Sequence, residues 1–341
     1  MTDHLLEVND LSTFFKTDRG VVRAVDGVTF NLDEGTTLGV VGESGSGKSV
    51  LSRSIMGLLP KYNTIKGGSA RFDGTEIVDK KPKELRRLWG TGMSMIFQDP
   101  MTSLNPVVKI GRQITEGLRL HFDFTKNQAN DTAEELLRSV GIPEPHRRLS
   151  EYPHQLSGGM RQRVVIAIAL SCGPKLLFAD EPTTALDVTV QAQILNLLEK
   201  QQQERRMTMV LVTHDLGVVA GRTDEIMVMY AGQAVEKATT KRLFSNMRHP
   251  YTEALLKSIP KLSNPSHTRL EAIPGRPPNM IAPPPGCRFA PRCPYAQDKC
   301  HREPPPLVED AQDAGHLYRC WFPVQINTSA RDLAGALAGK N

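Results

Sequence analysis

Residues 37–51, which read TLGVVGESGSGKSVL, constrain the fold of this chain more than any other segment. A buried-strand pattern runs into a glycine-rich loop that begins at Gly42 and ends in Lys48 and Ser49, and a helical pattern follows. This order is typical of the phosphate loop G-x-x-x-x-G-K-S/T, whose glycines let backbone N–H groups turn inward around phosphate oxygens. The helix that follows points its positive end at the same phosphates. The segment therefore predicts an α/β fold that binds a nucleoside triphosphate.

The polar side chains of this loop have separate predicted roles. Lys48 supplies a positive charge near the β- and γ-phosphates, and Ser49 is placed to ligate Mg²⁺. The predicted nucleotide-binding residues are Gly42, Ser44, Gly45, Gly47, Lys48, Ser49 and Val50. A chance glycine-rich turn is the alternative interpretation, and the flanking strand and helix patterns argue against it.

A second apolar run, PKLLFADEP at residues 174–182, reads as a buried parallel strand with Asp180 and Glu181 at its C-terminal edge. Open α/β sheets bind their ligands at that edge. We expect Asp180 to hold Mg²⁺ through water and Glu181 to polarise the attacking water. A surface acid pair after a core strand is the alternative, but the phosphate loop supplies a nucleotide that these carboxylates would serve.

The segment HQLSGGMRQRVVIAIAL, residues 154–170, places Ser157, Gly158 and Gly159 before a long helix with an apolar face. The free N–H groups and the dipole at a helix start favour bound anions, so this segment predicts a second phosphate site. One nucleotide does not usually need two phosphate cradles in one chain.

Six motifs follow one another in an order that resembles the ATPase subunit of ABC (ATP-binding cassette) transporters. They are the phosphate loop, Gln98 in MIFQDP, LSGG at 156–159, LLFADEP at 176–182, ALD at 185–187 and VTHD at 212–215. The resemblance covers about residues 5–240, and six ordered motifs are far more specific than any one of them.

The resemblance implies that two such domains sandwich two ATP molecules. Ser157, Gly158 and Gly159 would then contact the γ-phosphate held by the partner's phosphate loop, which accounts for the second cradle. Asp187 would cross the dimer interface. Met160, where many family members have Gln, is a departure that puts full activity of this segment in doubt.

The same resemblance assigns further residues of the nucleotide site. Gln98 would sense Mg²⁺ and couple to the membrane domain, and His214 would touch the γ-phosphate, so the predicted catalytic residues are Gln98, Glu181 and His214. The predicted Mg²⁺ ligands are Ser49, Gln98 and Asp180. Phe15 matches the aromatic residue that stacks on adenine, and the neighbouring Phe14 is the alternative for this role.

Local patterns predict several elements around these motifs. Residues from about 103 to 165 read as a helical subdomain, in which DTAEELLRSVG shows a capping box of Asp131 and Glu134 and a stop at Gly141. DEIMVMYAGQAVEK reads as a hairpin with Ala231 and Gly232 at its turn. We expect residues 1–240 to form the ATPase domain and residues 241–341 a C-terminal extension.

That extension resembles the C-terminal region of oligopeptide, dipeptide and nickel importer ATPases. The resemblance rests on HPYTEALLKSIP at 249–260, a proline-rich linker and CRFAPRCPYA at 287–296. Four of the five cysteines lie here, at Cys287, Cys293, Cys300 and Cys320. Cytosolic thiols are normally kept reduced, so such a cluster favours metal binding or redox chemistry over structural disulfides.

We expect these four thiolates to ligate one metal centre that folds a small, proline-framed domain. Tetrahedral Zn²⁺ and a [4Fe–4S] cluster both suit four thiolates. The gaps do not match the short C-x2-C spacing usual for zinc, and the resembling importer tails are associated with an iron–sulfur centre, which favours [4Fe–4S]. His301 and His316 leave a mixed Cys/His zinc site open.

The leading hypothesis is an ATP-hydrolysing subunit that powers peptide import and uses ATP and Mg²⁺. The start of the chain lacks signal-peptide features and its longest apolar run, VVIAIAL, is far too short to span a bilayer, so transport would need a separate permease. The family implies two transmembrane permease subunits, a second related ATPase that makes a heterodimer, a substrate-binding protein outside the membrane, and a place on its cytoplasmic face.

Nickel as cargo, a metal-thiolate redox protein, and a nontransport cassette ATPase that acts on DNA or the ribosome are the alternatives. Repair members of the last class typically insert long coiled coils between the halves of the ATPase, and translation members carry two ATPase cores in one chain. This sequence shows neither, so no nucleic-acid partner is expected.

Overall fold

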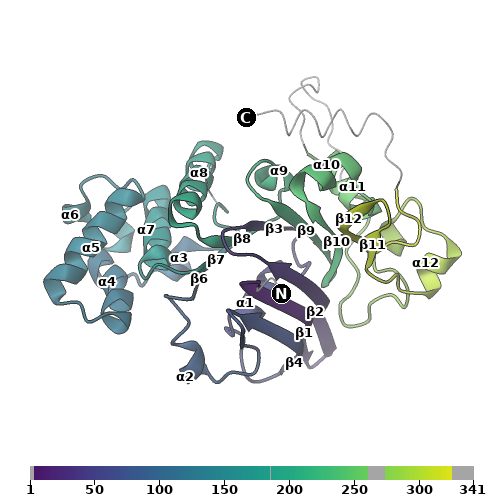
Figure 1. Cartoon of the computed structure of the whole chain (residues 1–341), viewed down its shortest axis with the longest axis horizontal. Helices are drawn as coiled ribbons and strands as arrows, with labels where there is room; N and C mark the ends of the chain where they lie inside the picture. Colours follow the sequence, from purple (N-terminus) through teal and green to yellow (C-terminus); the bar gives the residue numbers. More distant parts are fainter. Residues whose placement is uncertain (1–3, 185, 260–272, 325–341) are drawn as a thin grey trace. The chain divides into compact units, whose positions relative to one another are not determined.

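The computed structural model describes residues 4–184, 186–259 and 273–324 of the 341-residue chain. The chain divides into two compact units. The first unit comprises Met1–Leu32, Thr37–Asp79 and Leu211–Asn341, and the second comprises Asp33–Thr36 and Lys80–Val210. Figure 1 shows their elements in sequence colours. In the described residues no helix is both long and apolar enough to cross a membrane.

The first unit contains a four-stranded antiparallel sheet in the order β2-β1-β4-β5. Its strands are β1 (Leu6–Thr17), β2 (Gly20–Leu32), β4 (Thr64–Phe72) and β5 (Thr75–Glu76). Strand β1 is central, because it pairs with β2 on one side and with β4 on the other. Its residues Leu6, Val8, Leu11 and Thr13 are buried, which gives this strand one face toward the core.

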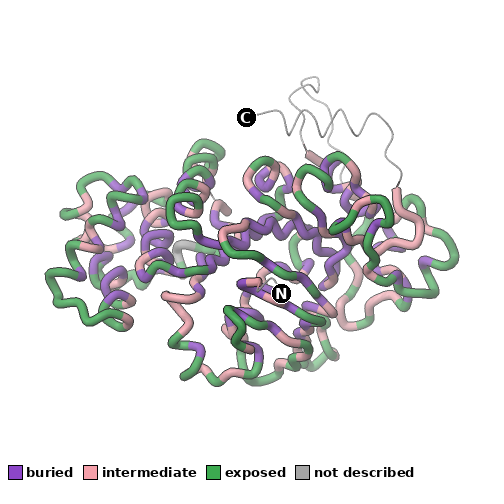
Figure 2. The backbone as a smooth tube through the Cα atoms, viewed as in Figure 1, coloured by how far each residue is buried: buried purple, intermediate pink, exposed green. Residues whose placement is uncertain are grey.

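A second set of strands in the first unit carries the phosphate-loop segment. In the order β11-β12-β10-β9-β3, these strands are β11 (Val308–Asp310), β12 (Asp313–Tyr318), β10 (Gln233–Thr239), β9 (Glu225–Tyr230) and β3 (Thr37–Val41). Strands β3 and β9 are parallel and buried along almost their whole length (Figure 2). Strand β8 (Thr208–Thr213) contains residues of both units, because the division in the sequence falls between Val210 and Leu211.

The predicted hairpin is confirmed. Strands β9 and β10 pair antiparallel around Ala231 and Gly232, whose φ angles are 47° and 82°. Two successive residues with positive φ form the turn that matches the twist of a two-residue hairpin, and glycine tolerates this conformation without strain.

The helices of the first unit lie between its strands in the sequence. Helix α1 (Lys48–Ile55) starts directly after the phosphate loop, and the others are α9 (Leu216–Val219), α10 (Thr240–Asn246), α11 (Pro250–Lys257), α12 (Asp298–Arg302) and the 3-10 turn η2 (Ala290–Arg292). Helix α11 begins at Pro250, after His249 caps it by accepting a bond from the Tyr251 N–H at 3.0 Å. Proline suits the first helical position because its missing N–H has no partner there.

The second unit has two parallel strands and most of the helices. The strands are β6 (Met93–Ile96) and β7 (Leu176–Asp180). The helices are α2 (Pro82–Leu85), α3 (Pro100–Ser103), α4 (Ile110–His121), α5 (Lys126–Ser139), α6 (Pro145–Arg148), α7 (Gly158–Leu170) and α8 (Val188–Arg205), with the 3-10 turn η1 (Pro153–Gln155). Helices α4, α5 and α7 pack against one another (Figure 1).

One predicted helix start was wrong. The capping box expected at Asp131 and Glu134 lies inside α5, which begins after Thr125. Thr125 Oγ1 accepts from the Gln128 N–H at 3.3 Å, and the Gln128 side chain accepts from the Thr125 N–H at 2.9 Å. Thr125 and Gln128 therefore form the same kind of reciprocal cap one and a half turns earlier.

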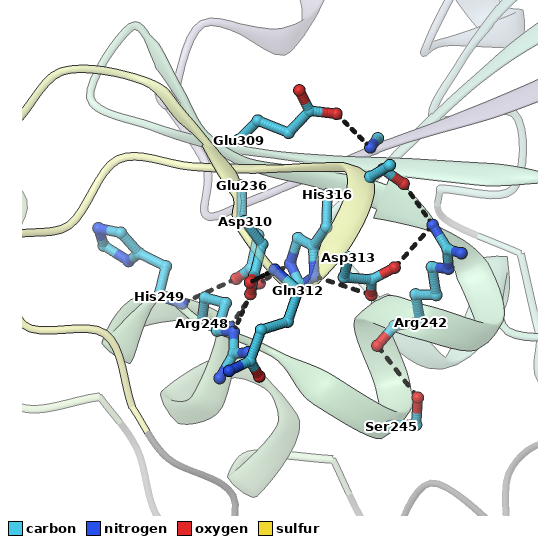
Figure 3. A network of polar contacts seen from close by, with 12 residues as sticks. Glu236, Arg242, Ser245, Arg248, His249, Glu309, Asp310, Gln312, Asp313 and His316 are labelled. Atoms are coloured by element: carbon cyan, nitrogen blue, oxygen red, sulfur yellow. Dashed lines mark hydrogen bonds and ion pairs between the residues drawn. The ribbon is translucent and has the colours of Figure 1, made fainter.

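Strand β12 pairs with β10 within the first unit, and a buried polar network lies at this pairing (Figure 3). Glu236 of β10 and His316 of β12 are fully buried, and His316 Nε2 lies 2.7 Å from Glu236 Oε1. Glu236 also accepts from the N–H groups of Arg248 and His249, at 2.6 and 3.0 Å. The Arg248 side chain pairs with Asp310 of β11, so charged groups are matched where the extension meets the sheet.

Candidate nucleotide-binding site

The phosphate loop wraps around the side chain of Lys48. The Lys48 Nζ donates to the carbonyl oxygens of Gly42 and Glu43, at 2.7 and 3.0 Å. The Ser46 N–H donates to the Glu43 carbonyl at 3.2 Å, and the Ser46 carbonyl accepts from the Gly232 N–H at 2.9 Å. These bonds fix the course of the loop around the Lys48 side chain.

Two glycines of the loop are required by close backbone approach. A Cβ at Gly42 would lie 2.1 Å from the Met229 carbonyl oxygen, and one at Gly47 would lie 2.2 Å from the Ala24 carbonyl oxygen. Gly47 also has a φ of 102°, which side-chain-bearing residues rarely adopt. The loop therefore packs so closely against β9 and β2 that residues with a side chain do not fit at Gly42 and Gly47.

The first unit also positions Phe14, Phe15 and His214. Along β1, Phe15 is two residues from Thr13, whose Oγ1 lies 2.7 Å from Ser54 Oγ of α1. Alternation puts Phe15 on that same face, whereas Phe14 takes the other face, where the Arg23 guanidinium carbon lies 5.8 Å from its ring centre. His214 is exposed between β8 and α9.

The second unit brings Gln98 and Glu181 together. Gln98 follows β6 and Glu181 follows β7, and these strands are parallel neighbours, so their ends meet at one edge. The Gln98 Nε2 donates to Glu181 Oε2 at 3.0 Å, and Thr184 Oγ1 donates to the same oxygen at 2.9 Å. Glu181 has a φ of 46°. A positive φ in a non-glycine residue costs free energy, and such residues are enriched at functional sites as well as in turns.

Asp180 is the last residue of β7 and is fully buried. The predicted residues therefore fall into two groups. The phosphate loop, Phe15 and His214 belong to the first unit, whereas Gln98, Asp180, Glu181, the Ser157 segment and Asp187 belong to the second.

Ser157 and Asp187 are helix caps of the second unit. Ser157 Oγ accepts from the Met160 N–H at 3.3 Å at the start of α7, and Asp187 Oδ1 accepts from the Val190 N–H at 2.9 Å at the start of α8. The two helix starts touch, since a Cβ at Gly159 would lie 3.0 Å from Val190 Cγ1. Ser157, Gly158 and Asp187 are exposed. Ala185, the first residue of the ALD motif, lies outside the described residues.

The four cysteines of the extension line one small cavity. Cys287, Cys293, Cys300 and Cys320 are all free thiols, and His249, Phe289, Tyr295, Trp321 and Phe322 also contribute to the walls. Burial raises the pKa of Cys293 to about 11 and that of Cys320 to about 12, and the backbone at Tyr295 and Phe322 partly opposes this rise.

The predicted metal centre is not confirmed. Within residues 4–184, 186–259 and 273–324, no group of three or more His, Cys, Asp or Glu side chains is arranged to hold a metal ion. The histidines proposed for a mixed site are elsewhere, because His316 pairs with Glu236 and His301 is exposed. Sequence reasoning missed His249, which lines the cysteine cavity; its burial lowers its pKa to about 4.

The chain carries the phosphate loop between β3 and α1, the carboxylates after β7 and the LSGG segment at the start of α7, which are the motifs of the ATP-binding cassette ATPases. Residues 25–184 match the family model described as ABC transporter, and residues 235–300 match that of the oligopeptide/dipeptide transporter C-terminal region. A solved dimeric structure of the ATP-binding cassette MJ0796, in a post-hydrolysis state with ADP and Pi, aligns with a TM-score of 0.62 at 27% identity over 69% of this chain and 98% of that one. The predicted α/β ATPase fold is confirmed.

Two curated relatives match over nearly the whole chain. The oligopeptide transport ATP-binding protein OppD of Bacillus subtilis (strain 168) is 50% identical over 93% of this chain and 88% of its own length. OppD of Salmonella typhimurium is 49% identical over 94% of both chains. The chain belongs to the oligopeptide transport ATP-binding proteins of the ABC transporter family.

Proposed function

We propose that this chain is the ATP-hydrolysing subunit that powers import of peptides through a separate membrane permease. The observation that carries the proposal is the match to oligopeptide transport ATP-binding proteins over both the ATPase core and the cysteine-bearing extension. A general ATPase would need only the core, so similarity across the extension supports the transport branch of the family.

The first unit binds the nucleotide in this proposal. Backbone N–H groups of residues 42–49 surround the phosphates, Lys48 neutralises their charge, and Ser49 ligates Mg²⁺. Phe15 rather than Phe14 stacks on adenine, since Phe15 shares the face of β1 that Thr13 turns toward α1. His214 contacts the γ-phosphate from its exposed position after β8.

The second unit supplies the water-activating groups. Glu181 polarises the attacking water, and Gln98 and Thr184 hold its carboxylate in place through the hydrogen bonds at 3.0 and 2.9 Å. Asp180 and Gln98 complete the Mg²⁺ environment begun by Ser49. The exposed helix starts at Ser157 and Asp187 serve a second ATPase, whose bound ATP they complete.

The assembly has two transmembrane permease subunits and a second, related ATPase subunit. It lies on the cytoplasmic face of the membrane and receives cargo from an external substrate-binding protein. We assign residues 1–240 to the ATPase domain and residues 241–341 to the extension. Strand β12 of the extension pairs with β10, so the two parts share one sheet.

We further infer that Cys287, Cys293, Cys300 and Cys320 hold one metal centre, with [4Fe–4S] favoured over Zn²⁺. The donor set fits, because four free thiols line one cavity. Deprotonated thiols are the form that binds metals. A bound centre supplies folding energy to a segment with a small core.

Copurification tests the transport function. The tagged full-length chain is expected to bring down two multi-span membrane proteins and a second ATPase from detergent-solubilised membranes of its host. Added peptides and substrate-binding protein should stimulate ATP hydrolysis by that complex, and the Glu181→Gln complex should not respond. Recovery with ribosomes or DNA instead, and no peptide stimulation, would contradict the proposal.

A further inference from the structure

All N–H donors of the Arg292 guanidinium form hydrogen bonds with neighbouring residues. Its Nη1 donates to Glu43 Oε2 at 2.6 Å and to the Tyr230 hydroxyl at 3.2 Å, and its Nη2 donates to Glu43 Oε1 at 2.9 Å and to the Ile273 carbonyl at 3.2 Å. Its Nε donates to the Pro274 carbonyl at 2.8 Å. This side chain is 3% exposed. A buried, bidentate arginine–carboxylate pair fixes geometry as well as charge.

The partner of Arg292 is a residue of the phosphate loop itself. Glu43 follows Gly42, and its carbonyl accepts both the Lys48 Nζ and the Ser46 N–H. Its own N–H donates to the buried Tyr251 hydroxyl of α11 at 2.8 Å. The side chain and the backbone N–H of Glu43 are therefore both held by residues of the C-terminal extension.

The elements around Arg292 are rigidly packed. Tyr230, Tyr251 and Phe289 form an aromatic cluster with ring centres 4.5 to 5.4 Å apart. Arg292 ends the turn η2, which lies between Cys287 and Cys293. Its guanidinium position is thus set by the same short segment that forms the cysteine-lined cavity. Residues 277, 278 and 280 of the preceding segment also line a pocket with Glu43, Ser44 and Gly45.

We propose that Arg292 is a positioning residue for ATP binding, which holds Glu43 and thereby the phosphate loop in its binding form. The proposal rests on the ATPase function above, and it adds a role for the extension in the nucleotide site. The Arg292 N–H donors are bonded to Glu43, Tyr230 and two backbone carbonyls, so it acts on the loop through Glu43. A purely structural arginine would stabilise the extension and leave ATP affinity unchanged.

The test compares the buried Arg292 with the partly buried Arg248, both of the first unit. Arg248 pairs with Asp310 in the same extension (Figure 3) and does not pair with Glu43. The dissociation constant of a fluorescent ATP analogue with Mg²⁺ is measured for the full-length chain and for Arg292→Lys, Arg292→Ala and Arg248→Ala, with thermal unfolding of each nucleotide-free chain. Arg292→Lys keeps the charge but loses the bidentate geometry, so it serves even where Arg292→Ala fails to fold.

We expect Arg292→Lys to weaken ATP binding about tenfold and Arg248→Ala to change it less than about twofold. Because Arg292 acts through Glu43, the effects of Arg292→Lys and Glu43→Gln should not add in the double variant. In the assembled transporter the KM for ATP should rise while kcat changes little, which is the pattern of lost binding.

The proposal is overturned if Arg292→Lys binds ATP as the unmodified chain does, or if Arg248→Ala weakens binding equally. It is also overturned if the losses of binding free energy caused by Arg292→Lys and Glu43→Gln add in the double variant. Failure of the unmodified chain to bind the analogue is a different result, since it contradicts the ATPase function itself.

Discussion

Gln98 donates a hydrogen bond of 3.0 Å to the carboxylate of Glu181, and this bond links the ends of two parallel strands. In the proposed function this bond joins the amide assigned to Mg²⁺ sensing to the carboxylate assigned to water activation. We therefore expect movement of the segment after β6 to change the position of Glu181. In the proposed assembly, a permease that contacts the Gln98 segment would be linked to the hydrolysis step through this one bond.

Replacing Glu181 by Gln should preserve ATP binding and lower turnover by about 100-fold or more, because the charge that orients water is lost while the side-chain shape is kept. Single-turnover hydrolysis in the assembled transporter measures the effect. Glu135→Gln, an exposed carboxylate on α5, is the control and should retain the normal rate. Near-normal turnover of Glu181→Gln would remove Glu181 from the mechanism.

Replacing Lys48 by Ala should weaken nucleotide binding by about tenfold or more, since a phosphate-facing charge disappears. The same change removes the bonds to the Gly42 and Glu43 carbonyls, so the loop also loses its internal support. Equilibrium binding of the ATP analogue reports the loss. Lys61→Ala, at an exposed position outside the loop, should bind normally, and an unchanged affinity of Lys48→Ala would refute the assignment.

The isolated chain should hydrolyse ATP slowly, because each site needs the Ser157 segment of another ATPase subunit. Addition of the partner ATPase and permease should raise the rate. Ser157→Arg should abolish that increase and leave ATP binding by the isolated chain intact, because Ser157 lies outside the chain's own phosphate loop. A fast rate that does not depend on protein concentration would disprove the composite site.

The chain prepared without oxygen should be brown, absorb broadly near ~400 nm and contain about four irons and four sulfides per chain. Cys300→Ser should lose colour and iron. Cys172→Ser should keep both, because Cys172 is a free thiol in the second unit and does not line the cavity. A colourless preparation with one zinc would exclude the cluster and keep the four-ligand site, whereas no metal would exclude both.

Local sequence patterns predicted those elements whose conformation is determined by neighbouring residues in the sequence. The glycines of the phosphate loop, the apolar run before Asp180 and the turn at Ala231 carry their structure within a few residues. Helix α5 shows a local signal that was missed, because Thr125 and Gln128 have the spacing of a capping box and start the helix.

The partners of buried charged residues could not be predicted. Glu43 is an unspecified position in its motif, and nothing in its neighbourhood indicates Arg292. His316 was considered as a metal ligand from its nearness to cysteines in sequence, but pairing of β12 with β10 places it against Glu236. Such pairs depend on strand order, which becomes visible only when the chain is folded.

The contact between Glu43 and Arg292 joins positions 249 residues apart, and this separation sets an order of events during synthesis. A ribosome that adds about 5–20 residues per second needs on the order of ten seconds or more to reach Arg292 after Glu43. Through that interval the loop lacks the arginine that fixes its carboxylate. A nascent chain, or a product released before residue 292, should therefore bind ATP weakly, so that nucleotide capture waits until the extension has been synthesised as far as Arg292.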